Sequence, residues 1–256
     1  AGVHGFVTRD DIPPDELRRA GREQLAPYDV SLRDEHVLAV RRVAGGFEAE
    51  TASGRTEGRM ILIASGMRDR IPKLEGLEAI YAKSAHQCPF CDGWEERDGA
   101  LAAYGSGDEG AIAALGLLTW SKDIIYFTGG QAPPSAEKAA VLAKKRIRIV
   151  CDPIARLANE DGRLTHVVLE GGQAIARSAL FLHHGQVPAT TFAVDLGCDA
   201  EPEKGFVKCD AHGRTNAKGV YVAGDLSGGA ELAIVAAGEG ARAAHAIVCD
   251  LREERT

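Results

Sequence analysis

Two cysteines and an aspartate stand together in the run Cys88-Pro89-Phe90-Cys91-Asp92-Gly93. Two thiols separated by two residues have the spacing of a dithiol/disulfide centre. Only the thiolate is nucleophilic, and a CxxC pair at a helix N-terminus favours that form through backbone N–H groups and the helix dipole. We therefore take Cys88 as the candidate nucleophile. Asp92 is the candidate general acid/base, because a neighbouring negative charge would disfavour a thiolate but a carboxyl group can carry its proton.

Two other interpretations of the pair stay open at this point. A zinc site would need a second Cys pair or two suitably spaced histidines. His86 could add one ligand, but the other cysteines form no second pair: Cys151, Cys198, Cys209 and Cys249. The spacing could also be a chance pairing of structural thiols. We favour the redox centre because of the motif that follows it, and we expect no bound metal.

A GxGxxG turn, made by Gly105, Gly107 and Gly110, follows a strand-like run at residues 100–104. Such glycines let the backbone approach a pyrophosphate at the start of a helix. A nucleotide site then needs, about 20 residues later, an acid for the ribose of NADH or basic residues for the 2′-phosphate of NADPH. Residues 127–130 read Phe-Thr-Gly-Gly and offer neither. The turn therefore either binds NADPH or NADH, or only keeps the architecture of such a site.

A third candidate site follows a strand-like run at residues 220–223. Gly224 and Asp225 come directly after this run, and a long apolar helix follows over about residues 230–250. An aspartate at a strand end beside a buried helix suits a ligand hydroxyl and the edge of a flavin ring. The alternative is that Gly-Asp is an ordinary turn and helix cap. The residues at the helix start are Glu231, Leu232 and Ala233.

Two different patterns of elements surround these motifs. Residues 13–26 have a proline start and an amphipathic pattern, which predicts a helix. The strand-like runs that follow have short glycine-bearing turns, so we expect an antiparallel meander of residues 37–43, 47–51 and 60–64.

From about residue 98 the pattern changes to strand, glycine turn, helix and strand, which is a βαβ unit. The helix is expected at residues 110–120 and the second strand at 123–127. We then expect a helix at 135–145, a strand at 146–151, a hairpin turning at 159–163 and an apolar strand at 179–183. Gly185 and Pro188 indicate a domain junction after this strand. The chain is thus predicted to be an α/β protein with a central module inserted between two flanking pieces.

Composition excludes some classes of partner. The chain has 256 residues, 45% hydrophobic residues and a net charge of −7. Nucleic-acid binding is not expected, because it requires clustered Lys and Arg. A membrane partner is not expected either, because no run approaches the roughly 18 apolar residues of a membrane span. Six cysteines in a chain of this length do not form a disulfide scaffold, and four of them are far apart in sequence, so we expect a reducing, cytoplasmic setting.

Taken together, the motifs resemble the thioredoxin reductase-like flavoproteins of the pyridine nucleotide-disulfide oxidoreductase family. The matching residues are Ala64-Ser65-Gly66, the CPFCDG run placed 14 residues before the GxGxxG turn (Cys91 to Gly105), Gly224-Asp225, and Ala236–Gly240 in the closing helix. The stretch from His4 to Asp10 is similar to the HGFLTRD stretch of one subgroup, which includes dithiol oxidases of the gliotoxin type.

This resemblance implies two Rossmann-like, three-layer domains. An FAD-binding domain would consist of residues 1–69 and 185–256, and an NAD(P)-binding-like domain of residues 70–184 would carry the Cys pair. The FAD contacts would be Ala64, Ser65, Gly66, Gly224, Asp225, Glu231, Leu232 and Ala233, with His4 near the flavin. The family's first strand–GxGxxG–helix unit, which binds the FAD pyrophosphate, is not in the sequence. We expect it upstream of Ala1.

The resemblance also implies a function, which is electron transfer between a redox-active Cys pair and FAD. Cys91 would face the flavin, Cys88 would exchange with the substrate, and Asp92 would donate the proton. The expected partner is a thioredoxin-like protein or a small dithiol or disulfide, and the expected assembly is a homodimer. Two alternatives are an oxygen-dependent oxidase of small dithiols and a non-catalytic, redox-sensing scaffold. The oxygen-dependent oxidase is favoured by one difference from the reductases, because Phe-Thr-Gly replaces the His-Arg-Arg that they use to bind NADPH.

Overall fold

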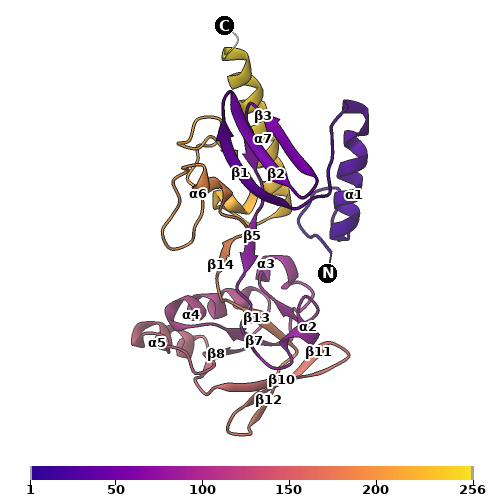
Figure 1. The fold of residues 1–256 in the computed structure, drawn as a ribbon. Coiled ribbons are helices and arrows are strands. Elements are labelled where there is room, and N and C mark those ends of the chain that lie inside the picture. The colour runs from indigo at the N-terminus through magenta and orange to yellow at the C-terminus, as the bar shows by residue number, and fades with distance from the viewer. Residues whose placement is uncertain (1, 255–256) are drawn as a thin grey trace. The chain divides into compact units, whose positions relative to one another are not determined.

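The computed structural model describes residues 2–254, and the chain divides into two compact units (Figure 1). The first unit consists of residues 70–185 together with the residues up to His4. The second consists of residues 5–69 and those from Gln186 onward. The chain therefore crosses between the units after His4, after Asp69 and after Gly185.

A five-stranded parallel sheet forms the centre of the first unit. Its strands are, in spatial order, β6 (Ala85–His86), β13 (Ala179–Leu182), β7 (Ala100–Tyr104), β8 (Asp123–Phe127) and β9 (Arg148–Val150). Parallel neighbours need a crossover connection, and helices provide it here. The helix α4 (Gly107–Gly116) joins β7 to β8, and α5 (Ala136–Lys144) joins β8 to β9.

Both faces of this sheet are buried, which explains its almost continuous apolar strands. Alternate residues point to opposite faces. Leu101, Tyr126 and Phe181 lie in one core cluster with residues of α4 and α5. Ala102 and Phe127 lie in a second cluster, shared with an antiparallel sheet of β10 (Ile154–Glu160), β11 (Arg163–Leu169) and β12 (Ala174–Ala176). The first unit thus has three layers, as expected.

The hairpin between β10 and β11 turns on Asp161 and Gly162, which both have positive φ, at 51° and 79°. Asp-Gly is the preferred pair for such a two-residue turn. The buried Ser84, just before β6, fixes the tip of the hairpin. Its hydroxyl donates to the Gly162 carbonyl at 3.2 Å and accepts from the Leu164 N–H at 2.8 Å. The hairpin tip is therefore held against the chain that leads into the CxxC segment.

The second unit contains smaller sheets and a long helix. Its helices are α1 (Pro14–Leu25) and the long α7 (Ala233–Glu253). Its strands form an antiparallel meander of β1 (Val37–Val43), β2 (Gly46–Thr51) and β3 (Gly54–Gly58). Two further strand pairs are the parallel β4 (Ile61–Ile63) and β15 (Val220–Val222) and the antiparallel β5 (Met67–Asp69) and β14 (Gln186–Pro188). Short helices complete the two units: α2 (Leu77–Ile80) and α3 (Pro89–Asp92) in the first, and α6 (Phe192–Asp195) in the second.

The meander prediction was wrong in its third strand. Residues 54–58 form that strand, and the run at 60–64 instead supplies β4, which pairs in parallel with β15. The Gly-Arg-Thr-Glu-Gly strand is exposed along its whole length, so no apolar pattern marks it. The βαβ unit, the helix near 135–145, the hairpin and the closing helix are confirmed. The helix α4 begins three residues earlier than expected, at Gly107, because the end of the glycine turn is already helical.

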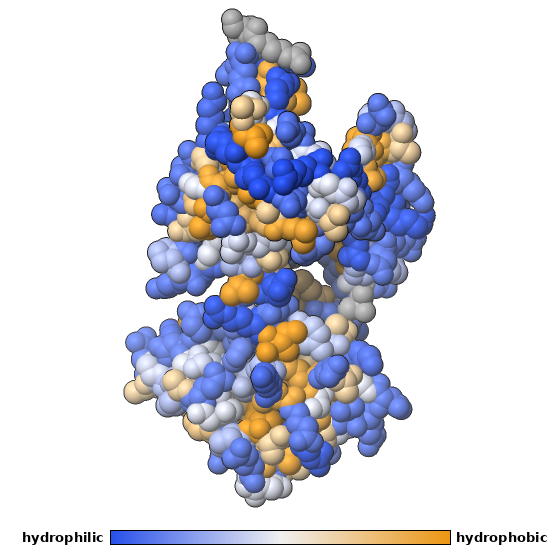
Figure 2. Space-filling model, in the orientation of Figure 1, coloured by the Kyte–Doolittle hydropathy of each residue, from blue (hydrophilic) through white to orange (hydrophobic). Residues whose placement is uncertain are grey.

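The surface mixes residue types. Figure 2 shows hydrophilic residues spread over the visible face of both units, with apolar patches between them. In residues 2–254 no helix has the length and apolar character needed to cross a membrane.

Candidate functional site

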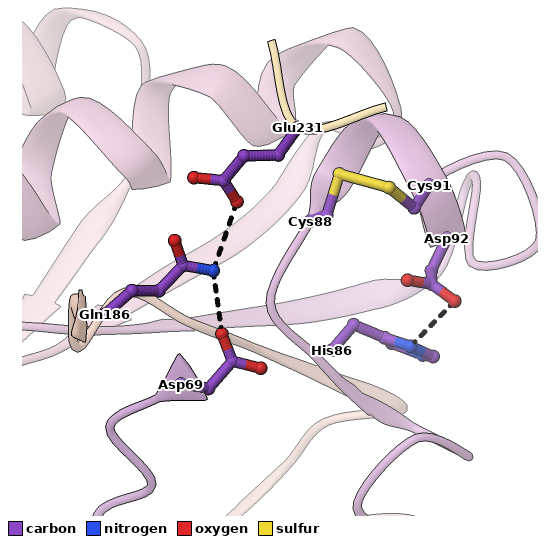
Figure 3. The surroundings of a disulfide bond; sticks show 7 residues. All are labelled: Asp69, His86, Cys88, Cys91, Asp92, Gln186 and Glu231. Atoms are coloured by element: carbon purple, nitrogen blue, oxygen red, sulfur yellow. Dashed lines mark hydrogen bonds and ion pairs between the residues drawn. A yellow bond between two sulfur atoms is a disulfide. The ribbon is translucent and has the colours of Figure 1, made fainter. Parts of the chain in front are cut away.

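The two cysteines of the CxxC run form a disulfide in the first unit (Figure 3). Cys88 is the N-cap residue of the single-turn helix α3, and Cys91 lies within that turn. The Cα atoms are 5.3 Å apart, within the usual range for a disulfide. Phe90, between the two cysteines, is 78% exposed. A reactant in solution can therefore approach this turn.

Gly93 ends the CxxC turn because a side chain would not fit there. A Cβ at this position would overlap the Pro89 carbonyl oxygen and the indole ring of Trp120. Trp120 follows the helical segment that begins with α4. The βαβ unit therefore packs directly against the backbone that holds the disulfide.

A chain of charged groups extends from the disulfide turn into the protein. Asp92 lies on α3 beside Cys91, and its Oδ1 is 3.2 Å from Nδ1 of His86 (Figure 3). On the other side of the ring, Nε2 of His86 is 3.4 Å from Oε1 of Glu96. The side chains of His86 and Glu96 are each only 5% exposed. The imidazole is thus enclosed between two carboxyl groups.

Arg163 completes this chain from β11. Its Nη1 and Nη2 each donate to one oxygen of Glu96 at 3.1 Å, and Nη1 also donates to the Lys83 carbonyl at 3.0 Å. This fork-to-fork geometry fixes the Glu96 carboxylate and neutralises its charge. Sequence reasoning considered His86 only as a zinc ligand and missed both Glu96 and Arg163.

The ring of His86 is electrostatically favoured as a cation. Burial alone would lower its pKa, but hydrogen bonds to Asp92 and then to Glu96 outweigh that effect and raise the pKa to about 9. Burial likewise disfavours a charged Glu96, but the imidazole and Arg163 lower the pKa of its carboxyl group overall. At neutral pH the site therefore holds an imidazolium between two acceptors.

The remaining cysteines take no part in this site. Cys151, Cys198, Cys209 and Cys249 are free thiols. Among residues 2–254, no three His, Cys, Asp or Glu side chains are grouped so that they could hold a metal ion.

The GxGxxG motif begins directly after β7, and its Gly107 and Gly110 already belong to α4. The loop after β8 already uses polar groups of this turn. The Gly107 N–H donates to the Ala132 carbonyl at 2.8 Å, and the Asp108 carboxylate accepts from the Ser135 N–H at 2.7 Å. Thr128, at the end of β8, is fully buried and could not face a phosphate. The Gly107 N–H and the end of β8 are therefore poorly suited to bind the phosphate groups of a nicotinamide nucleotide.

In the second unit, the predicted flavin segments come together at the carboxyl ends of two parallel strands. Ile63 of β4 pairs with Val222 of β15, and the Ala223 N–H donates to the Ile63 carbonyl at 3.3 Å. Residues 64–66 and 224–225 therefore leave the sheet side by side. This edge is where open α/β sheets bind their ligands.

Acidic groups gather at this edge. The amide of Gln186 donates to Oδ1 of Asp69 at 2.9 Å and to Oε2 of Glu231 at 3.1 Å (Figure 3). Burial, Glu239 and Asp69 raise the pKa of Asp225, while burial and the nearby Asp225 and Asp69 raise that of Glu231. Carboxyl groups so placed can accept hydrogen bonds from hydroxyl groups of a sugar-alcohol chain, which is the chemistry that the ribityl chain of FAD offers. The residues present fit that part of the cofactor.

Gly224 is oriented by the closing helix. It has φ of 75°, and its N–H donates at 2.8 Å to Oε2 of Glu239, which also accepts from the Ser227 hydroxyl at 2.9 Å. In the loop after β4, the Ser65 hydroxyl is 3.0 Å from that of Thr190. His4, expected near the flavin, belongs to the first unit, and its Nε2 is 3.4 Å from Oε1 of Glu95.

Comparison with known proteins identifies the family. Residues 14–240 match the model of the pyridine nucleotide-disulphide oxidoreductases. A probable thioredoxin reductase of Arthroderma benhamiae is 26% identical, with 99% of this chain and 71% of that protein covered. Thioredoxin reductase aclD of Aspergillus oryzae is 27% identical, with 97% and 83% covered.

Solved structures agree with this match. A protein of Bacillus anthracis designated TrxB is 30% identical, with a TM-score of 0.92 and 100% of this chain and 86% of that chain covered. HlmI is 28% identical, with a TM-score of 0.94 and 100% and 81% covered. The chain therefore belongs to the pyridine nucleotide-disulphide oxidoreductase family and is a thioredoxin reductase-like, flavin-dependent oxidoreductase with FAD as its cofactor.

Proposed function

We propose that this protein is a dithiol/disulfide oxidoreductase in which Cys88 and Cys91 are the redox-active pair. The observation that carries the proposal is the Cys88–Cys91 disulfide at an exposed turn, directly followed by the carboxyl group of Asp92. The free cysteines lie far from it in sequence and are unpaired with one another. When bound, FAD supplies the two-electron acceptor or donor for this pair.

Exchange at the pair proceeds in two balanced steps. A substrate thiolate attacks Sγ of Cys88, so that a mixed disulfide forms and the Cys88–Cys91 bond breaks. Cys91 leaves as a thiolate and takes a proton from Asp92. The second substrate thiolate then attacks the substrate sulfur of the mixed disulfide and releases Cys88. The substrate dithiol has been oxidised by two electrons, and the pair has been reduced by two. The reverse sequence reduces a substrate disulfide.

Residues of the second unit would hold the cofactor. Asp225 and Glu231 would accept hydrogen bonds from its hydroxyl groups, and the backbone at Ala64–Gly66 and at Leu232-Ala233 would pack against it. His4 stays a prediction as a residue near the flavin, and its Nε2 lies 3.4 Å from Oε1 of Glu95.

The test is anaerobic reduction of the FAD-loaded full chain by dithiothreitol, followed by flavin absorbance. We expect bleaching in the wild type and in Cys151→Ser, which removes an exposed free thiol and serves as the matched control. Cys91→Ser should abolish bleaching and leave FAD bound. Unchanged bleaching in Cys91→Ser would refute the proposed electron path.

A specific observation favours oxidation of small dithiols by oxygen as a second candidate. The Gly107 amide and the Asp108 carboxylate are already paired with the loop after β8, and that strand ends without a basic residue. The same assay decides between the two. Rapid bleaching by NADPH would exclude the oxygen-driven oxidase. Absence of bleaching by NADPH, with reoxidation of the dithiol-reduced protein by oxygen, would exclude the NADPH-driven reductase.

The expected substrate is a thioredoxin-like protein or a small dithiol or disulfide. We propose that the enzyme is a homodimer and works in the cytoplasm. The names of the relatives support the first kind of partner, since they are called thioredoxin reductases. Four free thiols are consistent with a reducing compartment. Competition between reduced thioredoxin and dithiothreitol for the oxidised pair would separate a protein substrate from a small one.

A further inference from the structure

The surroundings of His86 determine which of its protons can move. Glu96 receives two N–H groups from Arg163 at 3.1 Å, so it is an ionised acceptor. The ring nitrogen 3.4 Å from Glu96, Nε2, must then be the donor of that contact. Arg163 and Glu96 therefore fix the proton on Nε2.

The other ring nitrogen faces Asp92. One proton between Nδ1 and Oδ1, which are 3.2 Å apart, can reside on either side, giving an imidazolium with a carboxylate or a neutral imidazole with a carboxylic acid. The side chain of Asp92 is 21% exposed, whereas that of His86 is only 5% exposed. The exposed end of the pair is therefore the carboxyl group on the disulfide turn, and the enclosed end is the imidazole.

We propose that His86 is the positioning and proton-supplying residue behind Asp92, with its Nε2–H held by the Glu96–Arg163 pair and its Nδ1 proton shared with the Asp92 carboxyl group. This inference rests on the proposed exchange at Cys88 and Cys91. When the S–S bond breaks, the Nδ1 proton of His86 passes to the Asp92 carboxylate, and Asp92 gives this proton to the departing thiolate. The imidazolium becomes neutral, the thiolate becomes a thiol, and the Asp92 carboxylate is restored.

The groups packed against the ring support this role. Asp92 comes from α3, Glu96 from the turn that follows, and Arg163 from β11, and the uncharged ring of Phe181 on β13 lies 5.4 Å away. Two negative and two positive groups alternate along this line, so transfer of the proton from Nδ1 to the Asp92 carboxylate leaves the line without a net charge. The raised pKa of His86 keeps the proton available at neutral pH.

The experiment follows the Cys pair directly. The FAD-loaded full chain is reduced anaerobically by excess dithiothreitol over about pH 6 to 10, quenched with an alkylating reagent, and analysed by mass for the Cys88–Cys91 peptide. His86→Gln keeps an N–H for Asp92 but carries no titratable proton. His166→Gln, which changes an exposed histidine on β11, is the matched control. The ratio of wild-type to variant rate at each pH cancels the ionisation of the reagent.

We expect His86→Gln to reduce the rate at least about tenfold near pH 7, with the ratio approaching one above the pKa of about 9. His166→Gln should give a ratio near one throughout. A His86→Gln ratio that is the same at all pH values would overturn the proposal, because a merely structural role has no reason to follow the ionisation of the ring.

Glu96→Gln provides a second, independent test. Removing the charge beside Nε2 takes away one of the two anionic partners of the imidazolium and should lower the pKa of His86. The rate ratio of Glu96→Gln to the double variant Glu96→Gln/His86→Gln should therefore fall toward one at a pH about one unit lower than the ratio of wild type to His86→Gln. An unmoved profile would contradict the tethering of Nε2. The proposed electron path fails separately: it is refuted by flavin bleaching in Cys91→Ser, whereas the alkylation assay reads the disulfide without any flavin signal.

Discussion

Raising the pH from about 6 to about 10 should destabilise the first unit by about 3 kcal/mol through His86 alone. The pKa of this group rises from 6.5, its ordinary value, to about 9 in the folded protein. A difference of about 2.5 units in pKa corresponds to about 3 kcal/mol. The ring is too well buried for solvent to screen much of this effect.

The sign follows from the direction of the shift. The folded state binds the proton more tightly than the unfolded state, so the stabilisation is complete below about pH 6.5. It is lost progressively as the pH rises through about 9. Burial alone would give the opposite sign, and the hydrogen bonds to Asp92 and Glu96 reverse it.

Urea unfolding followed by tryptophan fluorescence is the assay, because both tryptophans of the chain, Trp94 and Trp120, lie in the first unit. The free energy of unfolding of wild type minus that of His86→Gln should fall by about 3 kcal/mol between pH 6 and pH 10. Other titrating groups are common to both proteins and cancel. A difference that stays constant within about 0.5 kcal/mol would refute the electrostatic account of His86.

Two further perturbations test other parts of the molecule. Asp225→Asn should weaken FAD binding by about tenfold to a hundredfold, because a charge-assisted hydrogen bond contributes about 1.5–3 kcal/mol. Equilibrium titration by flavin fluorescence measures this effect, with Asp195→Asn on α6 as the control, and an unchanged affinity would remove Asp225 from the cofactor site. Gly93→Ala should cost about 1–3 kcal/mol in urea unfolding, because its Cβ would overlap Trp120 and the Pro89 carbonyl. Gly116→Ala, which has open space and a helical φ of −60°, should instead be neutral or slightly stabilising, and equal losses in the two variants would contradict the packing argument.

Local patterns account for the parts of the fold that could be predicted from the sequence. The βαβ unit has buried strands on both sides of a glycine turn, and the Asp161-Gly162 hairpin has a turn signal of its own. The strand at 54–58 has neither an apolar pattern nor a strong strand former except Thr56, so nothing local distinguishes it from a loop.

The candidate site likewise contains residues that the sequence predicts and residues that only the fold brings together. The Cys pair and Asp92 are adjacent in sequence, and their spacing indicates their chemistry. The supporting groups are not adjacent: Arg163 lies 67 residues after Glu96, and the contact between them depends on how the β10–β11 hairpin packs. Two signals were nevertheless present, namely a histidine two residues before Cys88 and an acid four residues after Asp92. Neither indicates a partner until the fold brings Arg163 to them.

The position of Arg163 at the first residue of β11 has a consequence for how the chain can vary. An exposed two-residue hairpin turn is normally one of the places where insertions are tolerated. Here the turn at Asp161-Gly162 sets the reach of Arg163 to Glu96, and Ser84 holds Gly162 of the turn and Leu164 of β11. One extra residue would shift the strand register and turn the guanidinium to the other face. The length of this surface hairpin is therefore constrained by proton chemistry at a disulfide more than 70 residues earlier in the chain.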